Sequence, residues 1–380
     1  MNPQIQVDLL NSDEFEIVKK AVETSGWSEA SVRPFTRFGF SGAKMLVVER
    51  IDEPGVPQIL KISTEKDISE ELRGLELAKN KVAGVRMGVR VSVAGISIQG
   101  VLYELHESAD GGDGVADLND IYNICLDSND EDLPNQKLFP NLDAALGRFG
   151  KAHVLINSSG PNPTYGQVFR RYQREKHDSR IARLFEGNPQ GLHLHGVAVP
   201  HNPLGPHQRK LQRRRVGKFR ASFIHGDLHP SNIVLSDLLG LDLIDFAWAH
   251  TEGHLFLDYV MLESSMRFKA FPRDINPHCL LEVDRELNRT LLGDAYEIAS
   301  QFRGDFARRR LTVMAKSVMT VRERLASVLG NQGAKFSQGE IDTEYQRVMY
   351  LVLAGQEKFQ SFPLLRTTLN LHLLREALDL

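Results

Sequence analysis

This sequence has few cysteines, no long apolar run and only a small net charge. The 380 residues include only two cysteines, Cys125 and Cys279, which excludes a disulfide framework and favours a reducing cytosol. No apolar run reaches the length of a membrane-spanning helix, and the polar, acidic N-terminus is unlike a signal peptide. A formal net charge of -3 gives no bias toward nucleic acid or an anionic membrane. We therefore expect a cytoplasmic protein without a membrane or nucleic-acid partner.

The chain is long enough for two lobes, each with its own core. Residues 13–25 have the spacing of an amphipathic helix, with Phe15, Val18 and Val22 on one side. Residues 33–105 contain β-branched runs bounded by turn clusters, one helical stretch (EKDISEELRGLELAKN) and a hairpin pattern around Gly95. These patterns predict an N-terminal extension over residues 1–32, followed by a small β-rich lobe.

The remainder, residues 106–380, is predicted to form a larger and mostly helical lobe. Nearly everything after Leu255 has a helical period, and a few strands are expected around residues 222–247. Residues 107–136 are rich in Asp, Asn, Gly and Ser, and residues 186–215 include a second loop-like stretch, so both predict exposed insertions. The fold class expected from this order of elements is α+β with two lobes.

Polar residues interrupt two apolar runs in the segment FIHGDLHPSNIVL, residues 223–235. Asp227 is followed five residues later by Asn232, and the next apolar run, LDLID, ends at Asp245. A carboxylate and an amide oxygen are hard ligands that suit Mg²⁺, and they leave Asp227 to meet an incoming hydroxyl. Taken alone, Asp227 has the simpler interpretation of an Asx-type turn between strands. The order of the three residues is more specific than any one of them.

That order resembles the protein-kinase signature, in which an Asp precedes an Asn and then a metal-binding Asp-Phe pair. The form HGDLHPSN is similar to the aminoglycoside phosphotransferase and choline kinase-like branch of the kinase fold. The resemblance covers about residues 33–268 and implies a bilobal protein-kinase-like fold, with a nucleotide-binding N-lobe and a helical C-lobe. We expect His225 and His229 to be structural rather than to transfer protons.

Departures from the protein-kinase pattern narrow the class. Gly226 stands where protein kinases usually carry an Arg, and Ala247 replaces the glycine of the Asp-Phe-Gly motif. Asp258 follows Asp245 by only thirteen positions, which is too short for a regulated activation segment. By the resemblance, Asp258 would open a helix and steady the catalytic loop. These features favour a small-molecule kinase.

The resemblance also implies residues in the small lobe that hold the nucleotide. Lys61, in the strand QILKIS, would contact the α- and β-phosphates, and Glu71 in the next helix would hold that lysine. Glu70 and Glu76 are rivals for the second role. A small-residue turn, FGFSGAK, would bring backbone N–H groups to the phosphates, although its spacing also fits an ordinary hairpin turn. Its candidate residues are Gly39, Ser41 and Gly42.

The remaining implied roles concern the nucleotide base, the metal and the acceptor. Backbone groups from Tyr103 to Leu105 would meet the adenine where the lobes join. Asp227 would orient the substrate hydroxyl and accept its proton, while Asn232 and Asp245 would hold the Mg²⁺ that bridges the phosphates of ATP.

The function implied is therefore ATP- and Mg²⁺-dependent phosphotransfer to a hydroxyl of a small molecule. A cationic amine is one option for that substrate, with Glu252, Glu263 and the acid-rich insertion as candidate contacts. Two alternatives stay open: a non-catalytic nucleotide-binding or regulatory module on the same fold, and a protein kinase.

Two further stretches are not explained by this interpretation. The basic run QRKLQRRRVGKFR, residues 208–220, favours a solvated surface, with an anionic ligand as the alternative. The stretch GLHLHGVAVPHNPLGPH contains four histidines but no cysteine nearby, which favours loop residues over a zinc site. Those histidines are His193, His195, His201 and His207.

Overall fold

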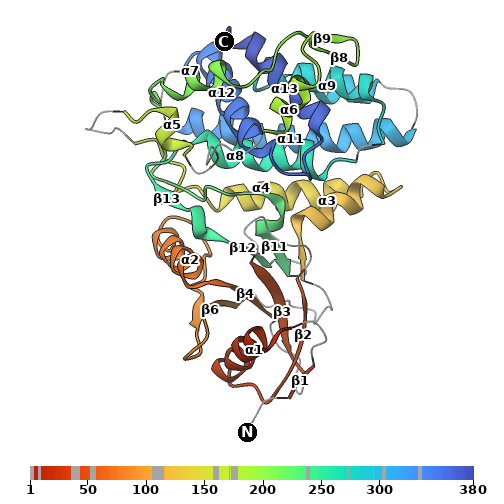
Figure 1. Ribbon diagram of the computed structural model, residues 1–380. Helices are drawn as coiled ribbons and strands as arrows, with labels where there is room; N and C mark the ends of the chain where they lie inside the picture. Colours follow the sequence, from red (N-terminus) through yellow and green to blue (C-terminus); the bar gives the residue numbers. More distant parts are fainter. Residues whose placement is uncertain are drawn as a thin grey trace.

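The computed structural model shows a small β-rich lobe and a larger helical lobe. Figure 1 draws the β-rich lobe at the bottom and the helical lobe at the top. The expected bilobal α+β fold is confirmed. The structure describes residues 4–6, 10–35, 43–51, 57–104, 115–156, 162–170, 172, 179–236, 240–272, 274–293, 295–301, 305–332 and 336–380. Among these residues, no helix combines the length and apolar character needed to cross a membrane.

The N-lobe is built on a six-stranded sheet in the order β1-β2-β3-β4-β6-β5. Its first two strands pair in parallel and the other neighbours are antiparallel. The strands are β1 Gln4–Gln6, β2 Glu29–Pro34, β3 Lys44–Arg50, β4 Gln58–Thr64, β5 Val89–Val91 and β6 Ile98–Glu104.

Alternation along β4 sends successive side chains to opposite faces of this sheet. Leu60 packs in the cluster that contains the buried residues of α1, Ser12–Thr24. Ile59 packs in the cluster that contains the buried residues of α2, Glu65–Ala78. Lys61 shares a face with Ile59, so strand register alone directs it toward α2.

The N-terminal segment is part of the small lobe rather than an appendage. The strand β1 pairs with β2, and α1 covers one face of the sheet with Ile17, Val18, Ala21 and Val22. The predicted apolar side of this helix, with Phe15, Val18 and Val22, is partly wrong, because the side chain of Phe15 is 37% exposed.

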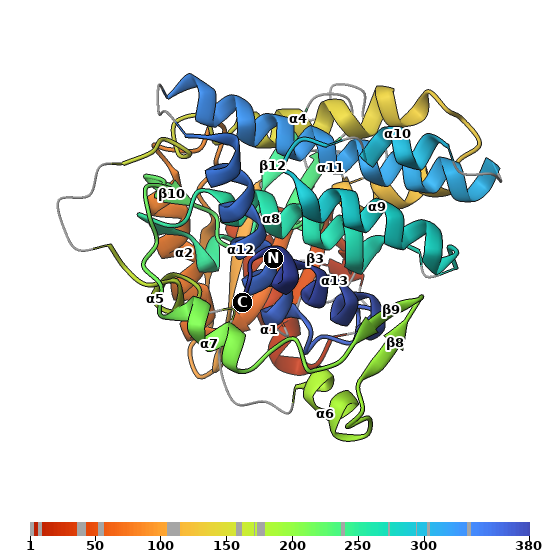
Figure 2. The same cartoon turned by 90° about the horizontal axis from the view of Figure 1, so that it is seen from above.

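The helical lobe surrounds α8, which packs against both α11 and α12 (Figure 2). Its helices are α3 Leu118–Asp127, α4 Phe139–Gly147, α5 Tyr165–Val168, α6 Arg180–Glu186, α7 Pro206–Gln212, α8 Phe256–Ser264, α9 Pro277–Arg289, α10 Ala295–Ser300, α11 Asp305–Asn331, α12 Gln338–Gln356 and α13 Leu364–Ala377. Its strands are β7 Val115–Asp117, β8 Leu192–Leu194, β9 Val197–Val199, β10 Phe223–Ile224, β11 Ile233–Ser236, β12 Gly240–Leu243 and β13 His250–Thr251. Short π-helical turns span Pro134–Leu138 and Ser265–Ala270, and 3-10 turns span Pro230–Asn232 and Phe246–Trp248.

The structure differs from the exposed insertion expected over residues 107–136. Residues 115–117 form β7, which pairs with β11, the strand that follows Asn232. Asp117 caps the N-terminus of α3 by accepting from the backbone N–H of Asp120, and Tyr122 and Cys125 are buried in the core. In the second predicted insertion, residues 186–215, β8 and β9 form a hairpin beside α13.

The lobes meet where α2 lies against the 3-10 turn that follows Asp245. At Gly74 the approach is so close that an added Cβ would sit 1.8 Å from the carbonyl oxygen of Phe246. Because that atom belongs to the backbone, a side chain at this position would push the two lobes apart.

We expect Gly74→Ala to lower the free energy of unfolding by about 1–3 kcal/mol through overpacking at this junction. Gly339→Ala is the matched control, because Gly339 is also helical and an added Cβ there meets nothing within 4 Å. The control is expected to be neutral or stabilising by about 0.4–1 kcal/mol. Urea unfolding of both variants measures the difference, and equal stability of the two would contradict the close packing described here.

Candidate active site

The segment around Asp227 is a loop between two buried elements. It leaves β10 at Ile224, turns at Pro230–Asn232 and enters β11, whose hairpin with β12 returns the chain to Asp245. The side-chain amide of Asn232 donates to the carbonyl oxygen of Asp227 at 2.8 Å, and the backbone N–H of Ile244 donates to the carbonyl of Asn232 at 3.1 Å. These bonds bring Asp227, Asn232 and Asp245 to one end of the hairpin.

Asp258, near the start of α8, binds the backbone of this loop. Its carboxylate accepts the backbone N–H groups of His225 at 2.9 Å and Gly226 at 2.8 Å, and all three residues are buried. The ring of His153 contacts the same carboxylate through Nε2 at 3.0 Å and the hydroxyl of Tyr259 through Nδ1 at 2.9 Å. Because a carboxylate only accepts, the ring donates from Nε2 to Asp258. Asp258 therefore fixes the loop backbone, as the resemblance implied.

His225 braces the loop in the other direction. Its Nε2 donates to the carbonyl oxygen of Ile244 at 2.9 Å, and its Nδ1 accepts the backbone N–H of Asp227 at 3.3 Å. Burial lowers the pKa of His225, which keeps the ring neutral in this position. The contacts are those of a structural histidine that joins the loop to Ile244, between the end of β12 and Asp245.

Lys61 of the small lobe contacts one carboxylate in each lobe, Glu71 on α2 and Asp245 after β12. Its Nζ lies 2.8 Å from Oε2 of Glu71 and 2.6 Å from Oδ1 of Asp245. The other carboxylate oxygen of Glu71 accepts the backbone N–H of Phe246 at 2.7 Å. Among the three acidic candidates of α2, the buried Glu71 makes this contact, whereas Glu76 is exposed.

Burial and charge separate the three carboxyl groups of the site. Burial would raise the pKa of Asp245, but the Lys61 ammonium outweighs it and lowers that pKa to about 2. Burial raises the pKa of Asp227 to about 7, with the negative charge of Asp245 acting in the same direction. Burial would likewise raise the pKa of Asp258, but its hydrogen bond from His153 reverses the shift. Among these three aspartates, Asp227 is thus the one that can exchange a proton near neutral pH, and burial also raises the pKa of Glu71 to about 7.

The glycine at the second position of HGD is required by the backbone. Gly226 has a φ of +83°, and a Cβ placed there would lie 2.5 Å from the carbonyl oxygen of Trp248. An Arg at this position, as in protein kinases, does not fit this loop.

Several predicted nucleotide-contacting residues are outside what the structure describes. Gly39, Ser41 and Gly42 of the phosphate-loop prediction, and Leu105 of the adenine-site prediction, lie outside the described residues. Tyr103 is buried on β6, and burial together with the charge of Glu71 raises its pKa. Its side chain therefore faces the interior near Glu71, which leaves only its backbone for the predicted adenine contact.

The oxygen donors present would suit Mg²⁺. Asp245 supplies an ionised carboxylate and Asn232 an amide oxygen, both hard ligands, and magnesium takes few protein ligands when phosphates supply others. Among the described residues, no group of three or more His, Cys, Asp or Glu side chains could hold a metal by itself. This applies also to the stretch with His193, His195, His201 and His207.

Two of the acidic residues suggested for an amine-binding pocket, Glu252 and Glu263, form ion pairs with arginines. Glu263 is fully buried and pairs with Arg267 at 2.8 Å and Arg322 at 2.7 Å. Glu252 pairs with Arg220, the buried last residue of the basic run. Most other charged side chains of that run are exposed, as expected for a solvated surface, namely Arg209, Lys210, Arg213, Arg215 and Lys218.

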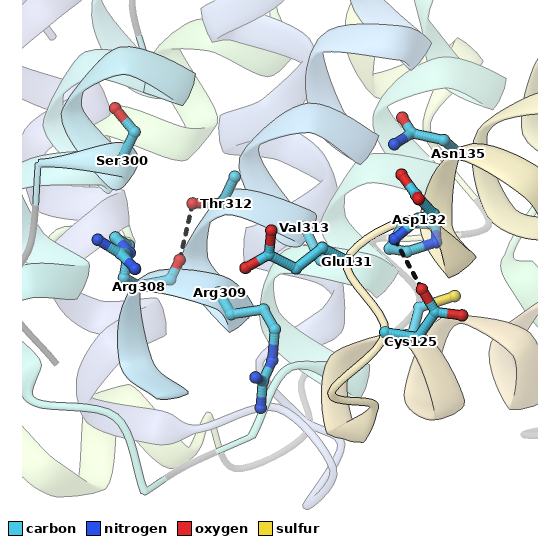
Figure 3. Close-up of a pocket in the computed structure, with 11 residues that line it drawn as sticks. Cys125, Glu131, Asp132, Asn135, Ser300, Arg308, Arg309, Thr312 and Val313 are labelled. Atoms are coloured by element: carbon cyan, nitrogen blue, oxygen red, sulfur yellow. Dashed lines mark hydrogen bonds between the residues drawn. The ribbon is translucent and has the colours of Figure 1, made fainter. Parts of the chain in front are cut away.

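A pocket of about 680 Å³ lies between the loop after α3 and the helices α10 and α11 (Figure 3). Asp130, Glu131 and Asp132 line it, and Glu131 points toward Thr312 of α11 in Figure 3. The helix α3 also contacts the turn Pro230–Asn232, and a helix of this length spans about 15 Å. None of the predicted site residues lines this pocket.

Comparison with known proteins gives structural likenesses only. No family model and no curated protein matches the chain. A microcompartment-associated aminopropanol kinase is 15% identical, with a TM-score of 0.35 over 89% of this chain and 96% of that one. A spectinomycin phosphotransferase in complex with ADP and spectinomycin is 8% identical, with a TM-score of 0.36 over 90% and 88%. A macrolide 2'-phosphotransferase from Brachybacterium faecium is 13% identical, with a TM-score of 0.33 over 86% and 96%. These proteins are of the kind that the sequence motifs resemble.

We expect Asp258→Asn to lower the free energy of unfolding by about 2–4 kcal/mol at pH 7. The Asp258 carboxylate accepts the backbone N–H groups of His225 and Gly226 and the ring of His153, and an amide cannot accept all three hydrogen bonds. The pKa of Asp258 is lowered by folding, so its stabilisation is complete above the unfolded value and is lost as pH falls through the folded value. The gap between wild type and variant should therefore close below about pH 4. Urea unfolding across pH measures it.

Asp143→Asn serves as the control for that measurement. Asp143 is 58% exposed and lies 3.7 Å from Arg324, so its loss should cost less than about 1 kcal/mol. A gap for Asp258→Asn that stays constant down to pH 2 would contradict the assigned role.

Proposed function

We propose that the protein is an ATP- and Mg²⁺-dependent phosphotransferase that acts on a hydroxyl group of a small molecule. The observation that supports this most directly is the contact of Lys61 with both Glu71 and Asp245, 184 positions away, beside a braced loop that carries Asp227. An ion pair between Lys61 and Glu71 that served stability alone would not need a braced loop beside it. If Asp227 only formed a turn, the chain would not need to bring Lys61 of the other lobe to the neighbouring Asp245.

Each residue has a definite part in this reaction. Asp227 accepts a hydrogen bond from the substrate hydroxyl and takes its proton, which its raised pKa permits near neutral pH. Lys61 binds the α- and β-phosphates and is kept in place by Glu71. Asp245 and Asn232 would hold Mg²⁺, which supplies neutralisation of the charge on the phosphates when bound. Positioning and charge compensation account for most of the rate in reactions of this type.

The catalytic role of Asp227 is tested by Asp227→Asn, with Asp245→Asn alongside it. We expect each to lower transfer by about 100- to 10,000-fold, because the first loses the proton acceptor and the second a metal ligand. ADP release is measured with a panel of small alcohols, and circular dichroism checks that the fold survives. Full activity in either variant would refute the assignment.

The pairing of Lys61 is tested separately by Glu71→Gln against Glu76→Gln. We expect Glu71→Gln to lower turnover by about 100-fold, because the lysine loses the group that orients it. Glu76 lies exposed on the same helix, and its replacement should leave turnover unchanged. Equal effects of the two substitutions would show that the position of Lys61 does not depend on Glu71.

The same measurements distinguish the two alternatives. Nucleotide binding without transfer to any acceptor would favour a regulatory module on this fold. Phosphorylation of peptides that is abolished by Asp227→Asn would favour a protein kinase.

A further inference from the structure

The pocket between the loop after α3 and the helices α10 and α11 contains none of the residues assigned to phosphotransfer (Figure 3). Its volume of about 680 Å³ lies within the range of about 300–1,000 Å³ that is typical of ligand pockets. The loop contributes Asp130, Glu131 and Asp132, and α11 contributes Arg309 and Thr312. Because these side chains are charged or carry a hydroxyl, the pocket suits a polar ligand rather than an apolar one.

Charges of both signs line this pocket without neutralising each other. Within the described part of the chain, the carboxylates of Glu131 and Asp132 form no hydrogen bond or ion pair. The guanidinium group of Arg309 also has no acidic partner there, and it contacts only the ring of Phe306, at 5.8 Å from the ring centre. In Figure 3 the side chain of Glu131 extends from the loop toward Thr312 of α11.

The acidic loop, residues 130–132, is tied to α11 on both of its sides along the chain. Before the loop, Arg310 donates to the carbonyl oxygen of Leu126 at 3.4 Å and pairs with Asp127. After the loop, Lys316 donates to the side-chain oxygen of Asn135 at 2.8 Å. These contacts set the spacing between the loop and the helix, so space is left between the charged side chains that line the pocket.

The combination of charges indicates the kind of ligand. A metal ion does not fit, because no group of three or more His, Cys, Asp or Glu side chains in the described ranges could hold one. A simple cation would neutralise only the acidic loop, and a simple anion only Arg309. A ligand with an ammonium group and a carboxylate neutralises both, and a carboxylate can also form two parallel hydrogen bonds with a guanidinium group.

We propose that this pocket binds a small zwitterion, whose ammonium group contacts Glu131 and Asp132 and whose carboxylate contacts Arg309. The ligand is bound without any bond being made or broken. The site is separate from the catalytic loop, and the inference does not depend on the proposed phosphotransferase function.

Isothermal titration with ligands that differ in charge tests the class of ligand. The zwitterions are glycine, β-alanine, 4-aminobutyrate and 6-aminohexanoate, which differ in the separation of their two charges. Each is compared with the amine and the carboxylate of the same chain length, such as butylamine and butyrate for 4-aminobutyrate. We expect at least one zwitterion to bind about tenfold or more tightly than both of its singly charged partners. Lack of binding by all four zwitterions at about 10 mM, or equal binding of the singly charged partners, would overturn the proposal.

Substitutions on the two sides of the pocket test which side chains hold the ligand. Glu131→Gln combined with Asp132→Asn, and separately Arg309→Gln, should each weaken the best zwitterion about tenfold or more, because each removes the charge of one side. The controls are Glu323→Gln and Arg285→Gln, at exposed positions of the same lobe outside the pocket, and both should leave the affinity unchanged. Circular dichroism checks that each variant is folded. Wild-type affinity in the acidic variant or in Arg309→Gln would place the zwitterion elsewhere and contradict the assignment.

Reversing one charge separates a direct contact from a general distortion of the pocket. In Arg309→Glu both sides are acidic, so 1,4-diaminobutane should bind about tenfold or more tightly than 4-aminobutyrate, the opposite of the wild-type order. Loss of both ligands, or an unchanged order, would mean that Arg309 does not contact the ligand and would refute the proposal. None of these measurements involves turnover, so their outcome is independent of whether the protein is a kinase.

Discussion

The site depends on the ion pairs that the ammonium group of Lys61 makes with Glu71 and Asp245. It carries one positive charge between two carboxylates, so the buried cluster with Glu71 and Asp245 keeps a negative surplus when both are ionised. Removing one partner from a buried pair of this kind typically costs about 3–5 kcal/mol, because the remaining charge is left uncompensated. The surplus also suits a divalent cation, since a cation could share Asp245 while Glu71 keeps its hold on the lysine. One ion pair thus joins the two lobes and prepares a site between them.

Three aspartates of the helical lobe have different chemistry because their surroundings differ. Asp258 receives two backbone N–H groups and a histidine, and Asp245 receives a lysine, so both are held ionised. Burial raises the pKa of the Asp227 carboxyl group to about 7, and the charge of Asp245 acts in the same direction. Separating the pKa values of neighbouring carboxyl groups is a general way to assign a base and a charged ligand to the same site. The bracing by Asp258 and His225 allows this because it holds the loop through its backbone, leaving the Asp227 carboxyl outside the brace.

Sequence patterns predicted the local parts of this arrangement better than the long-range ones. The resemblance to kinase motifs, together with a strand followed by a helix, was enough to propose Lys61 and Glu71, although Glu70 and Glu76 stayed as rivals. Composition misled over residues 107–136, because Asp, Asn, Gly and Ser also cap helices, and Asp117 does so at the start of the buried α3. The spacing of Leu118, Tyr122 and Cys125 is the helical signal that could have corrected this expectation.

The network around Glu263 could not be predicted from sequence, because its partners come from helices distant along the chain. Arg322 lies on α11, 59 positions after Glu263, and no local pattern distinguishes it from a surface arginine. This network changes what the acidic residues near the site can do, because a carboxylate that neutralises two buried guanidinium groups is unavailable to a substrate amine. Acidic residues close to a kinase-like motif therefore give no guide to the charge of the acceptor until their partners are known. In this lobe the carboxylate of Glu263 holds the buried Arg267 and Arg322 together, so it serves the interior of the lobe.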